Sequence, residues 1–341
     1  MSRIIFLCAF LVLSAVIAGT HFSLAETVVD FGSFSTSDVK QSSNKDTLAF
    51  VGDVMLARHV EYIEKRFGDG YVFQAMEPVS SSTTLVGNFE SAVAREHIRT
   101  PDLTFSFATP TSSLAALADY GFEYLSLANN HSYDKGEENF LYAKQQLDIR
   151  GITPFGDQVI GETSVTYTEI SGKSVALVGV YAVESAPAQE ELAVLFAQAS
   201  ELSDFQVAYV HWGVEYELTH SDFQEELAHA LVDAGADVVI GHHPHVVQNI
   251  ASYNGVYIFY SLGNFVFDQY FSQEVQEGLW LELDFSRDVT EYRLRPVTSV
   301  GSYSQPRFMS HYGASLFLSK LAKRSEKELS QAISEGVLTE L

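Results

Sequence analysis

The chain has 341 residues, of which 46% are hydrophobic, so it can bury a large core as one domain or two small ones. Aspartate and glutamate outnumber lysine and arginine by 44 to 20, which gives a formal charge of −24 and a surface that repels nucleic acid and anionic membranes. Cys8 is the single cysteine, so a chain cut after residue 25 has neither disulfides nor thiolate metal sites. Any bound metal must then be held by imidazole, carboxylate, amide or backbone oxygen.

The first 25 residues have the features of a secretory signal peptide. Arg3 gives a positive start, residues 4–18 form an apolar run, and Ser23 and Ala25 place small residues where signal peptidase reads. The alternative is an uncleaved anchor helix, although the run is short for a bilayer span. We therefore expect a protein that is secreted, periplasmic or attached to the cell envelope. Residues 26–45 are serine-rich and aperiodic, which predicts a disordered tether.

From residue 46 onward the chain alternates predicted strands and helices. Strands are predicted at 47–51, 83–86, 104–108 and 124–127, and helices at 56–67, 112–120 and 137–150. Gly121 and Gly151 follow two of these helices as stop signals. This alternation is typical of an α/β sandwich.

The second half of the chain repeats this alternation. Segments 164–170 and 174–180 predict a hairpin, further strands are predicted at 206–210, 238–240, 256–260 and 279–285, and helices at 188–199, 222–234 and 316–333. The hairpin and the late strands indicate mixed sheets in place of one parallel sheet. No composition break divides the chain after the tether, so we expect one domain at 46–300 and a helical extension at 301–341.

Five of the predicted strands end in side chains that can bind a metal or transfer a proton. They are Asp53, Asn88 with Glu90, Asn130 with His131, His211, and His242 with His243 and His245. Ligands of α/β sheets bind where strands end and loops begin. Each residue alone could belong to a turn, a cap or a half-buried histidine, but together they predict one site. His243 and His245 are two residues apart, so an extended backbone would point both rings the same way.

Six motifs around these residues resemble the successive blocks of a known family. They are FVGDVML at 50–56, GNFES at 87–91, LSLANNHSYD at 125–134, VHWGVEY at 210–216, GHHPHVVQ at 241–248 and YSLGNFVFD at 260–268. The family is CapA, the poly-γ-glutamate capsule biosynthesis proteins, which are similar to calcineurin-like metallophosphoesterases. The resemblance covers roughly residues 46–297, the length of one large domain.

The resemblance implies a four-layer α/β-β/α sandwich of the metallophosphoesterase type, with two mixed sheets and a metal centre at the strand ends. It implies a divalent ion (Mn, Zn, Fe or Mg), one or two per site. Matched position by position, the ligands would be Asp53, Glu90, Asn130, His211, His243 and His245. The catalytic residues would be His131, as general acid, and Asp53.

Other polar residues in the motifs would support this centre. His242, Asp134 and Glu215 are candidates for orienting the ligands, and the two carboxylates could equally be surface groups. Arg58 and Asn88 are candidates for substrate contact, since an arginine can bind carboxylate or phosphate with two hydrogen bonds. The alternative for Arg58 is an exposed residue at the start of a helix.

Two positions depart from the phosphoesterase pattern. Met55 stands where that pattern has the histidine of Asp-x-His, and a thioether is a poor ligand for hard or borderline ions. Glu90 stands where an aspartate is usual. Both departures favour one metal in place of two, or weaker binding.

These observations predict metal-dependent hydrolysis or transfer at an amide or phosphoester bond. The expected substrate is an anionic polymer such as poly-γ-glutamate, or a phosphorylated compound, and the expected partners are envelope biosynthesis proteins and not nucleic acid. The alternative is a non-catalytic accessory or polymer-binding protein of the envelope that retains the fold, which Met55 favours. A general periplasmic phosphatase is a third possibility.

Overall fold

The computed structural model describes residues 39–40, 45–287 and 289–340, all within one compact unit, Gly32–Leu341. The predicted signal peptide lies outside the described residues, as does the predicted tether except for residues 39, 40 and 45. Within the tether, Val39–Lys40 forms a short strand, β1, that pairs with β8 (Val165–Ile170). In the part of the chain that the structure describes, no helix has the length and apolar character needed to cross a bilayer.

The first sheet is built around β2 and is called here the β2 sheet, with strand order β17-β16-β15-β2-β3-β6-β7. Its parallel strands are β2 (Thr47–Val54), β3 (Thr83–Phe89), β6 (Phe122–Ser126) and β7 (Thr153–Phe155). Its antiparallel strands are β15 (Glu277–Asp284), β16 (Glu291–Thr298) and β17 (Arg307–Phe308). Outside this path, β14 (Asn264–Val266) pairs with β2, and β18 (Val337–Thr339) pairs with β16.

The second sheet, the β10 sheet, has the order β1-β8-β9-β10-β11-β13-β12. Its central parallel strands are β9 (Lys173–Ala182), β10 (Phe205–Trp212), β11 (Val238–His242) and β13 (Val256–Phe259). On either side of these, β8 (Val165–Ile170) runs antiparallel to β9, and β12 (Ile250–Tyr253) runs antiparallel to β13. Strands β8 and β9 form the predicted hairpin, and both sheets are mixed, as predicted.

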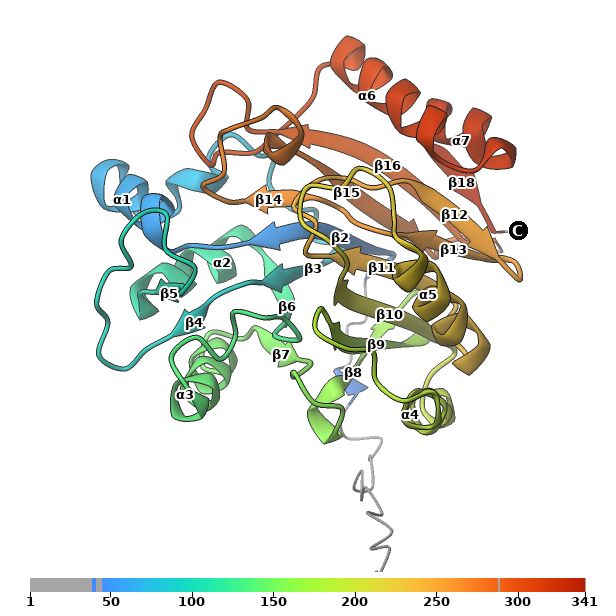
Figure 1. Cartoon of the computed structure of the whole chain (residues 1–341), viewed down its shortest axis with the longest axis horizontal. Coiled ribbons are helices and arrows are strands. Elements are labelled where there is room, and N and C mark those ends of the chain that lie inside the picture. Colours follow the sequence, from blue (N-terminus) through green and yellow to red (C-terminus); the bar gives the residue numbers. More distant parts are fainter. Residues whose placement is uncertain (1–38, 41–44, 288, 341) are drawn as a thin grey trace, which may run out of the picture. The chain divides into compact units, whose positions relative to one another are not determined.

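The two sheets pack face to face around one buried core. Phe50 of β2 and Tyr209 of β10 meet there with ring centroids 5.9 Å apart. Helices α1 (Arg58–Phe67), α2 (Leu114–Tyr120) and α3 (Glu137–Asp148) cover the outer face of the β2 sheet, and α4 (Gln189–Glu201) and α5 (Asp222–Ala234) cover that of the β10 sheet (Figure 1). The arrangement is the four-layer α/β-β/α sandwich that the resemblance implied.

The strand predicted at 104–108 is wrong except for its last residue. Residues 101–105 are exposed, and only β5 (Ala108–Thr109) pairs, with β4 (Ala92–Val93). The apolar residues of this segment, Leu103 and Phe105, lie on an exposed loop and not on a half-buried strand. Single-turn 3-10 helices occur at Tyr71–Phe73, Thr111–Ser113, Glu162–Ser164, Glu274–Gln276 and Lys327–Leu329.

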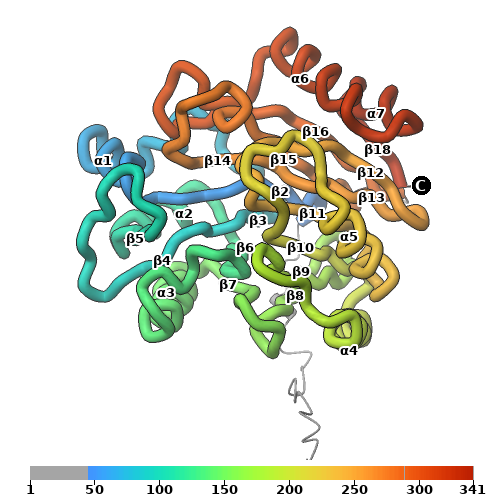
Figure 2. Tube along the Cα trace, viewed as in Figure 1, coloured from blue at the N-terminus to red at the C-terminus, as the bar shows by residue number. Residues whose placement is uncertain are grey.

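The closing helix predicted at 316–333 is also wrong as one helix. The chain forms α6 (His311–Arg324) and α7 (Ser330–Glu335), which lie beside β16 and β18 (Figure 2). The helix breaks at Ser325 because its hydroxyl accepts the Ile250 N–H at 2.9 Å and the next amide bonds the Ile250 carbonyl at 3.1 Å. Both helices add apolar side chains, Phe317, Leu321 and Ile333 among them, to the core that the two sheets share.

Candidate metal centre

The strand ends that the sequence singled out lie next to one another. In the β2 sheet Asp53 pairs in register with Asn88 on one side and with Asn264 on the other. In the β10 sheet His211 pairs in register with His242. Because the parallel strands of each sheet end at the same edge, these polar side chains gather where the two sheets face each other.

The backbone at His243 and His245 is not extended, which corrects the prediction made from their spacing. Their φ angles are +95° and +58°, in the left-handed region that side chains with a Cβ adopt at a cost of about 1–3 kcal/mol each. The chain turns sharply after β11 ends at His242, so the turn and not a pleat brings the two rings together. Their centroids lie 5.9 Å apart. Backbone of this kind is concentrated at functional sites.

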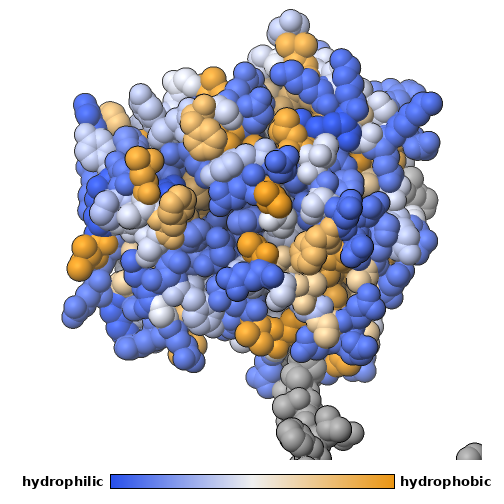
Figure 3. Space-filling view, in the orientation of Figure 1, coloured by the Kyte–Doolittle hydropathy of each residue, from blue (hydrophilic) through white to orange (hydrophobic). Residues whose placement is uncertain are grey.

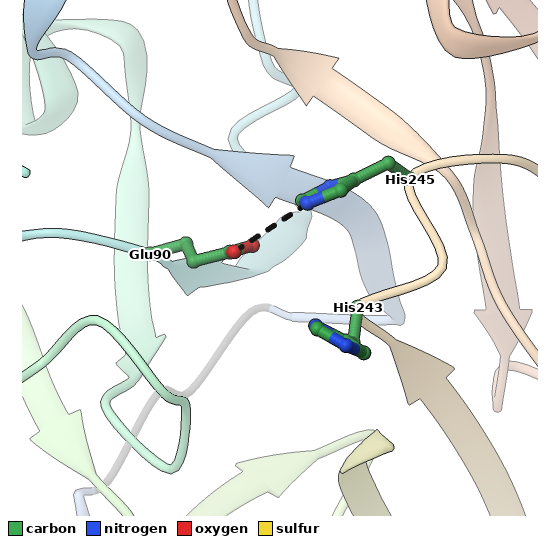
Figure 4. A group of neighbouring side chains, drawn as sticks. All are labelled: Glu90, His243 and His245. Carbon is green, nitrogen blue, oxygen red and sulfur yellow. Dashed lines mark ion pairs between the residues drawn. The ribbon is translucent and has the colours of Figure 1, made fainter. Parts of the chain in front are cut away.

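Glu90, at the end of a strand of the β2 sheet, lies close to histidines that follow strands of the β10 sheet. Figure 4 shows Glu90 extending toward His245 from the end of β3, with the His243 ring below these two side chains. One ligand atom from each of these three residues lies within 4.8 Å of the others, and the same holds for Asp53, Glu90 and His211. Glu90 therefore belongs to both candidate ligand groups.

The donor atoms of this cluster fit a cation. Both carboxylate oxygens of Glu90 are buried without a hydrogen-bond partner among the described residues, and the same is true of the Nδ1 atom of His243. A buried, unpaired carboxylate costs several kcal/mol unless a positive charge meets it. Carboxylate, imidazole and amide oxygen are donors that Mn, Zn, Fe and Mg ions accept in differing proportions.

His245 is held in the orientation that a ligand needs. Its Nδ1 atom lies 3.1 Å from Asp53 Oδ2 and 3.0 Å from Asn264 Oδ1. Both partners are acceptors, so Nδ1 carries the proton, and the lone pair is left on Nε2. The Nε2 atom lies 3.7 Å from Glu90 Oε1, inside the candidate site.

Asn88 connects the two sheets at the centre of the site. Its Nδ2 atom donates to Asp53 Oδ1 at 2.8 Å and lies 3.2 Å from His211 Nδ1. The other ring nitrogen of His211, Nε2, lies 2.8 Å from Asn130 Oδ1. Asn88 thus positions two predicted ligands, Asp53 and His211, and Asn130 lies beside His211. The substrate contact of Asn88 stays a prediction.

His131 also lies close to the Glu90 carboxylate. Its Nδ1 atom lies 2.8 Å from Asp134 Oδ2, and its Nε2 atom lies 3.9 Å from Glu90 Oε1. The ring stacks on Phe107 with centroids 3.8 Å apart. Asp134 therefore fixes the orientation of His131 and leaves Nε2 directed at the cluster.

The surroundings of the two buried carboxylates shift their pKa values in opposite directions. Burial raises the pKa of Asp53, but the neighbouring imidazoles of His242 and His245 outweigh burial and hold this pKa well below its usual range. Burial, together with the charges of Asp53 and Glu215, raises the Glu90 pKa well above 4.5. Asp53 is thus the ionised partner of the histidines, and Glu90 is the carboxylate that lacks compensation.

Two of the predicted imidazole ligands are kept neutral. Burial, with the charge of the neighbouring His245, lowers the pKa of His243 to about 4. Burial and the charge of His243 lower the pKa of His211 well below 6.5. Only a neutral imidazole offers a lone pair to a metal, so both rings are in the binding form at neutral pH.

Arg58 is buried, so the alternative of an exposed helix-start arginine is wrong. Its guanidinium pairs with Asp268, donates to the Thr104 carbonyl at 3.0 Å and lies 4.4 Å from the centre of the Phe107 ring. Its charge still lowers the pKa of Glu90, which places it within electrostatic reach of the site.

The remaining predicted residues fall into different surroundings. His242 is fully buried, with Nδ1 3.4 Å from Asp53 Oδ1 and its ring 4.2 Å from Tyr209. Glu215 is half-buried and acts on Glu90 through its charge. Met55 is a core residue whose sulfur accepts the Ala57 N–H at 3.0 Å.

Three polar residues were missed from the sequence. Asn129 donates to Asn88 Oδ1 at 3.1 Å and to the Phe89 carbonyl at 2.9 Å, and its own Oδ1 accepts the His131 N–H at 3.1 Å. Asn264 orients His245, and Asp268 pairs with Arg58. All three stand inside motifs that the sequence had singled out, and Asn129 stands next to Asn130, which was chosen in its place.

Fold and site together define a four-layer α/β protein with a candidate metal centre at the strand ends. The bacterial capsule synthesis protein PGA_cap family matches residues 47–269. The chain belongs to this family.

Two relatives and one solved structure show how far the similarity extends. The PGA biosynthesis protein CapA of Bacillus subtilis is 36% identical over 261 residues, covering 70% of this chain and 68% of that protein. The capsule biosynthesis protein CapA of Bacillus anthracis is 35% identical over 260 residues, covering 69% and 63%. A phosphatase of Mycoplasma pneumoniae aligns over 78% of this chain and 93% of its own at 11% identity and a TM-score of 0.43, a likeness that carries no argument about function.

Proposed function

We propose that this protein is a metal-dependent hydrolase or transferase that acts outside the cytoplasm on an anionic polymer of the poly-γ-glutamate type. The observation that carries the proposal is Glu90, a buried carboxylate without a hydrogen-bond partner among the described residues, shared by two groups of ligand-type side chains. Membership of a capsule synthesis family supports the polymer pathway. The apolar run at residues 4–18 supports export.

In such a site, some residues would bind the metal and another would donate a proton. Asp53, Glu90, His211, His243 and His245 would hold a dication, with Asn130 at its edge. The bound ion supplies positive charge that polarises a carbonyl or phosphoryl oxygen and acidifies water. Asp134 holds the Nδ1 atom of His131, which leaves Nε2 as the atom that would give a proton to a leaving group.

Metal binding and polymer cleavage test this proposal together. We expect the full chain to bind Mn²⁺ or Zn²⁺ and to shorten poly-γ-glutamate, measured by calorimetry and by size-exclusion chromatography. The double variant His243→Ala, His245→Ala should lose both activities. His229→Ala is the matched control, because that ring stacks on Tyr253 and takes no part in the site. Absence of a bound dication, or cleavage that survives the double variant, would overturn the proposal.

A non-catalytic accessory role is the second candidate. It is favoured by Met55, which occupies a core position where a phosphoesterase ligand would stand. In that case the folded double variant would still support polymer production in cells. The two candidates are therefore separated by one pair of substitutions and two readouts.

A further inference from the structure

A pocket of about 320 Å³ opens beside the candidate metal centre. It is lined by Arg58, Leu103, Phe105, Tyr216, Asp268 and Phe271, among others. The charged pair Arg58–Asp268 neutralises itself, so the lining offers mostly apolar surface. The volume corresponds to about ten water molecules, the size of a short alkyl chain or a bicyclic ring.

The apolar side chains around this pocket are exposed, and that exposure is unusual. Leu103 is 90% exposed, Phe105 80% and Phe271 66%. Exposed apolar residues that are grouped, and not scattered, mark binding sites on soluble proteins. Figure 3 shows apolar side chains, in orange, set among hydrophilic ones on the face that carries these loops.

The backbone holds two of these side chains in place at a cost. Leu103 and Tyr216 have φ angles of +64° and +68°, which bulky residues rarely adopt. Tyr216 is fixed further, since its N–H donates to the Pro244 carbonyl at 2.8 Å and its hydroxyl accepts from Gln269 Nε2 at 3.1 Å. Its ring also meets Phe271 edge-on, with centroids 5.1 Å apart.

The pocket adjoins the candidate metal centre through two of its lining residues. Tyr216 has its ring 6.2 Å from that of His245. Arg58 lies over Phe107, which in turn stacks on His131. A group bound in the pocket would therefore lie close to a group bound at the cluster.

We propose that this pocket binds an apolar group, an alkyl chain or an aromatic ring, carried by the same substrate whose anionic group reacts at the metal cluster. The inference rests on the proposed function, because it assigns the anionic group to that cluster. The inference goes beyond the proposed function because it requires an amphiphilic substrate. A polymer of glutamate alone has no such group, so the pocket would select an end or an anchor that bears one.

Two phosphonates of equal charge test the proposal. With the Mn²⁺-loaded full chain, calorimetry should give octylphosphonate at least tenfold tighter binding than methylphosphonate. Phe105→Ser and Phe271→Ser should bring this ratio close to one while leaving methylphosphonate affinity and Mn²⁺ binding unchanged. Tyr312→Ser, at an aromatic residue that is 73% exposed on α6 and does not line the pocket, is the control and should keep the full ratio.

The outcomes separate this inference from the proposed function. Bound Mn²⁺ with equal affinities for the two phosphonates overturns the pocket alone, as does a ratio that Tyr312→Ser lowers as much as Phe105→Ser. If the chain binds no Mn²⁺, the proposed function fails. The ratio is then measured without metal, and octylphosphonate binding that still depends on Phe105 and Phe271 supports the pocket.

Discussion

Glu90 carries a carboxylate that the fold buries beside a second carboxylate, Asp53, with two opposite electrostatic outcomes. His242 and His245 lower the pKa of Asp53, and His245 also hydrogen-bonds it. Glu90 lies farther from the nearest imidazole nitrogens and has no hydrogen bond among the described residues. Glu90 therefore lacks a compensating charge until a cation provides one. This makes it the position at which metal affinity and folding stability conflict.

Glu90→Gln should separate these two properties. In metal-free protein the raised Glu90 pKa gives stability that is present below 4.5 and lost as pH rises through the folded pKa, and glutamine removes that loss. We expect a higher melting temperature than wild type at pH 8, by about 2–4 °C for each kcal/mol gained, and Mn²⁺ affinity at least tenfold lower. Thermal scans with and without Mn²⁺ measure both, with the exposed Glu217→Gln as control. A variant that keeps its Mn²⁺ affinity would contradict this assignment.

Metal binding should release a proton, and Glu90 is its source. His243, with a pKa of about 4, and His211 are already neutral at pH 6–8 and release none. Mn²⁺ affinity should therefore rise with pH as Glu90 loses its proton in the metal-free state. Titrations in two buffers of different ionisation enthalpy count the protons. An Mn²⁺ affinity that is constant from pH 5 to pH 8 would show that Glu90 is not the source of the released proton.

At the scale of elements, local sequence signals located most helices and strands. Helix α5 matches the predicted 222–234 because Ser221 caps its first turn and Gly235 ends it. Strand β16 was missed although its charged and apolar residues alternate, because Pro296 counts against a strand, and its pairing with β15 outweighs that signal. Long-range pairing of this kind leaves little trace in a short segment.

For the site, too, the sequence predicted some features and could not predict others. The motifs identified which residue types gather at the strand ends. They could not give the left-handed backbone at His243 and His245, because that turn depends on contacts made by Tyr216 and other distant residues. They also could not show that Asn129 and Asn264 hydrogen-bond the predicted residues, since hydrogen-bond partners are set by tertiary packing.

Strand β11 depends on a glycine immediately before its histidines. A Cβ on Gly241 would collide with the Tyr260 carbonyl and the Trp212 indole nitrogen, which hydrogen-bond each other at 2.9 Å. Gly241→Ala should destabilise the fold by about 1–3 kcal/mol and weaken Mn²⁺ binding, because the end of β11 must move. Urea unfolding and calorimetry measure the two effects. Gly161→Ala, where a Cβ would meet open space, should change neither, and equal effects of both variants would refute this explanation.

At the scale of the whole molecule, Arg58 and Asp268 join the start of α1, just after the first motif, to the last motif. The two residues are 210 positions apart and form a buried ion pair, which the Asp268 carboxylate extends by accepting the His59 N–H at 3.1 Å. Asp268→Asn leaves the guanidinium buried without its counter-charge. We expect a loss of about 3–5 kcal/mol in the free energy of unfolding, measured in urea.

An exposed ion pair serves as the reference for this loss. Arg287, whose side chain is 62% exposed, lies 3.2 Å from Glu291. Arg287→Gln should cost less than about 1 kcal/mol, because solvent screens the pair. A similar cost for Asp268→Asn would mean that the buried pair does not join the start of α1 to the last motif energetically.

The site takes its side chains from both sheets, with Asp53 and His245 separated by 192 positions, and this has a consequence for folding kinetics. A cation cannot find its full set of ligands until β2, β3, β10 and β11 have paired and the sheets have docked. Metal should therefore slow the unfolding of the native protein and leave its refolding rate unchanged, which is the behaviour of contacts absent from the transition state. Stopped-flow refolding and unfolding with Mn²⁺ or a chelator would measure both rates, and faster refolding with metal would show that the site forms early.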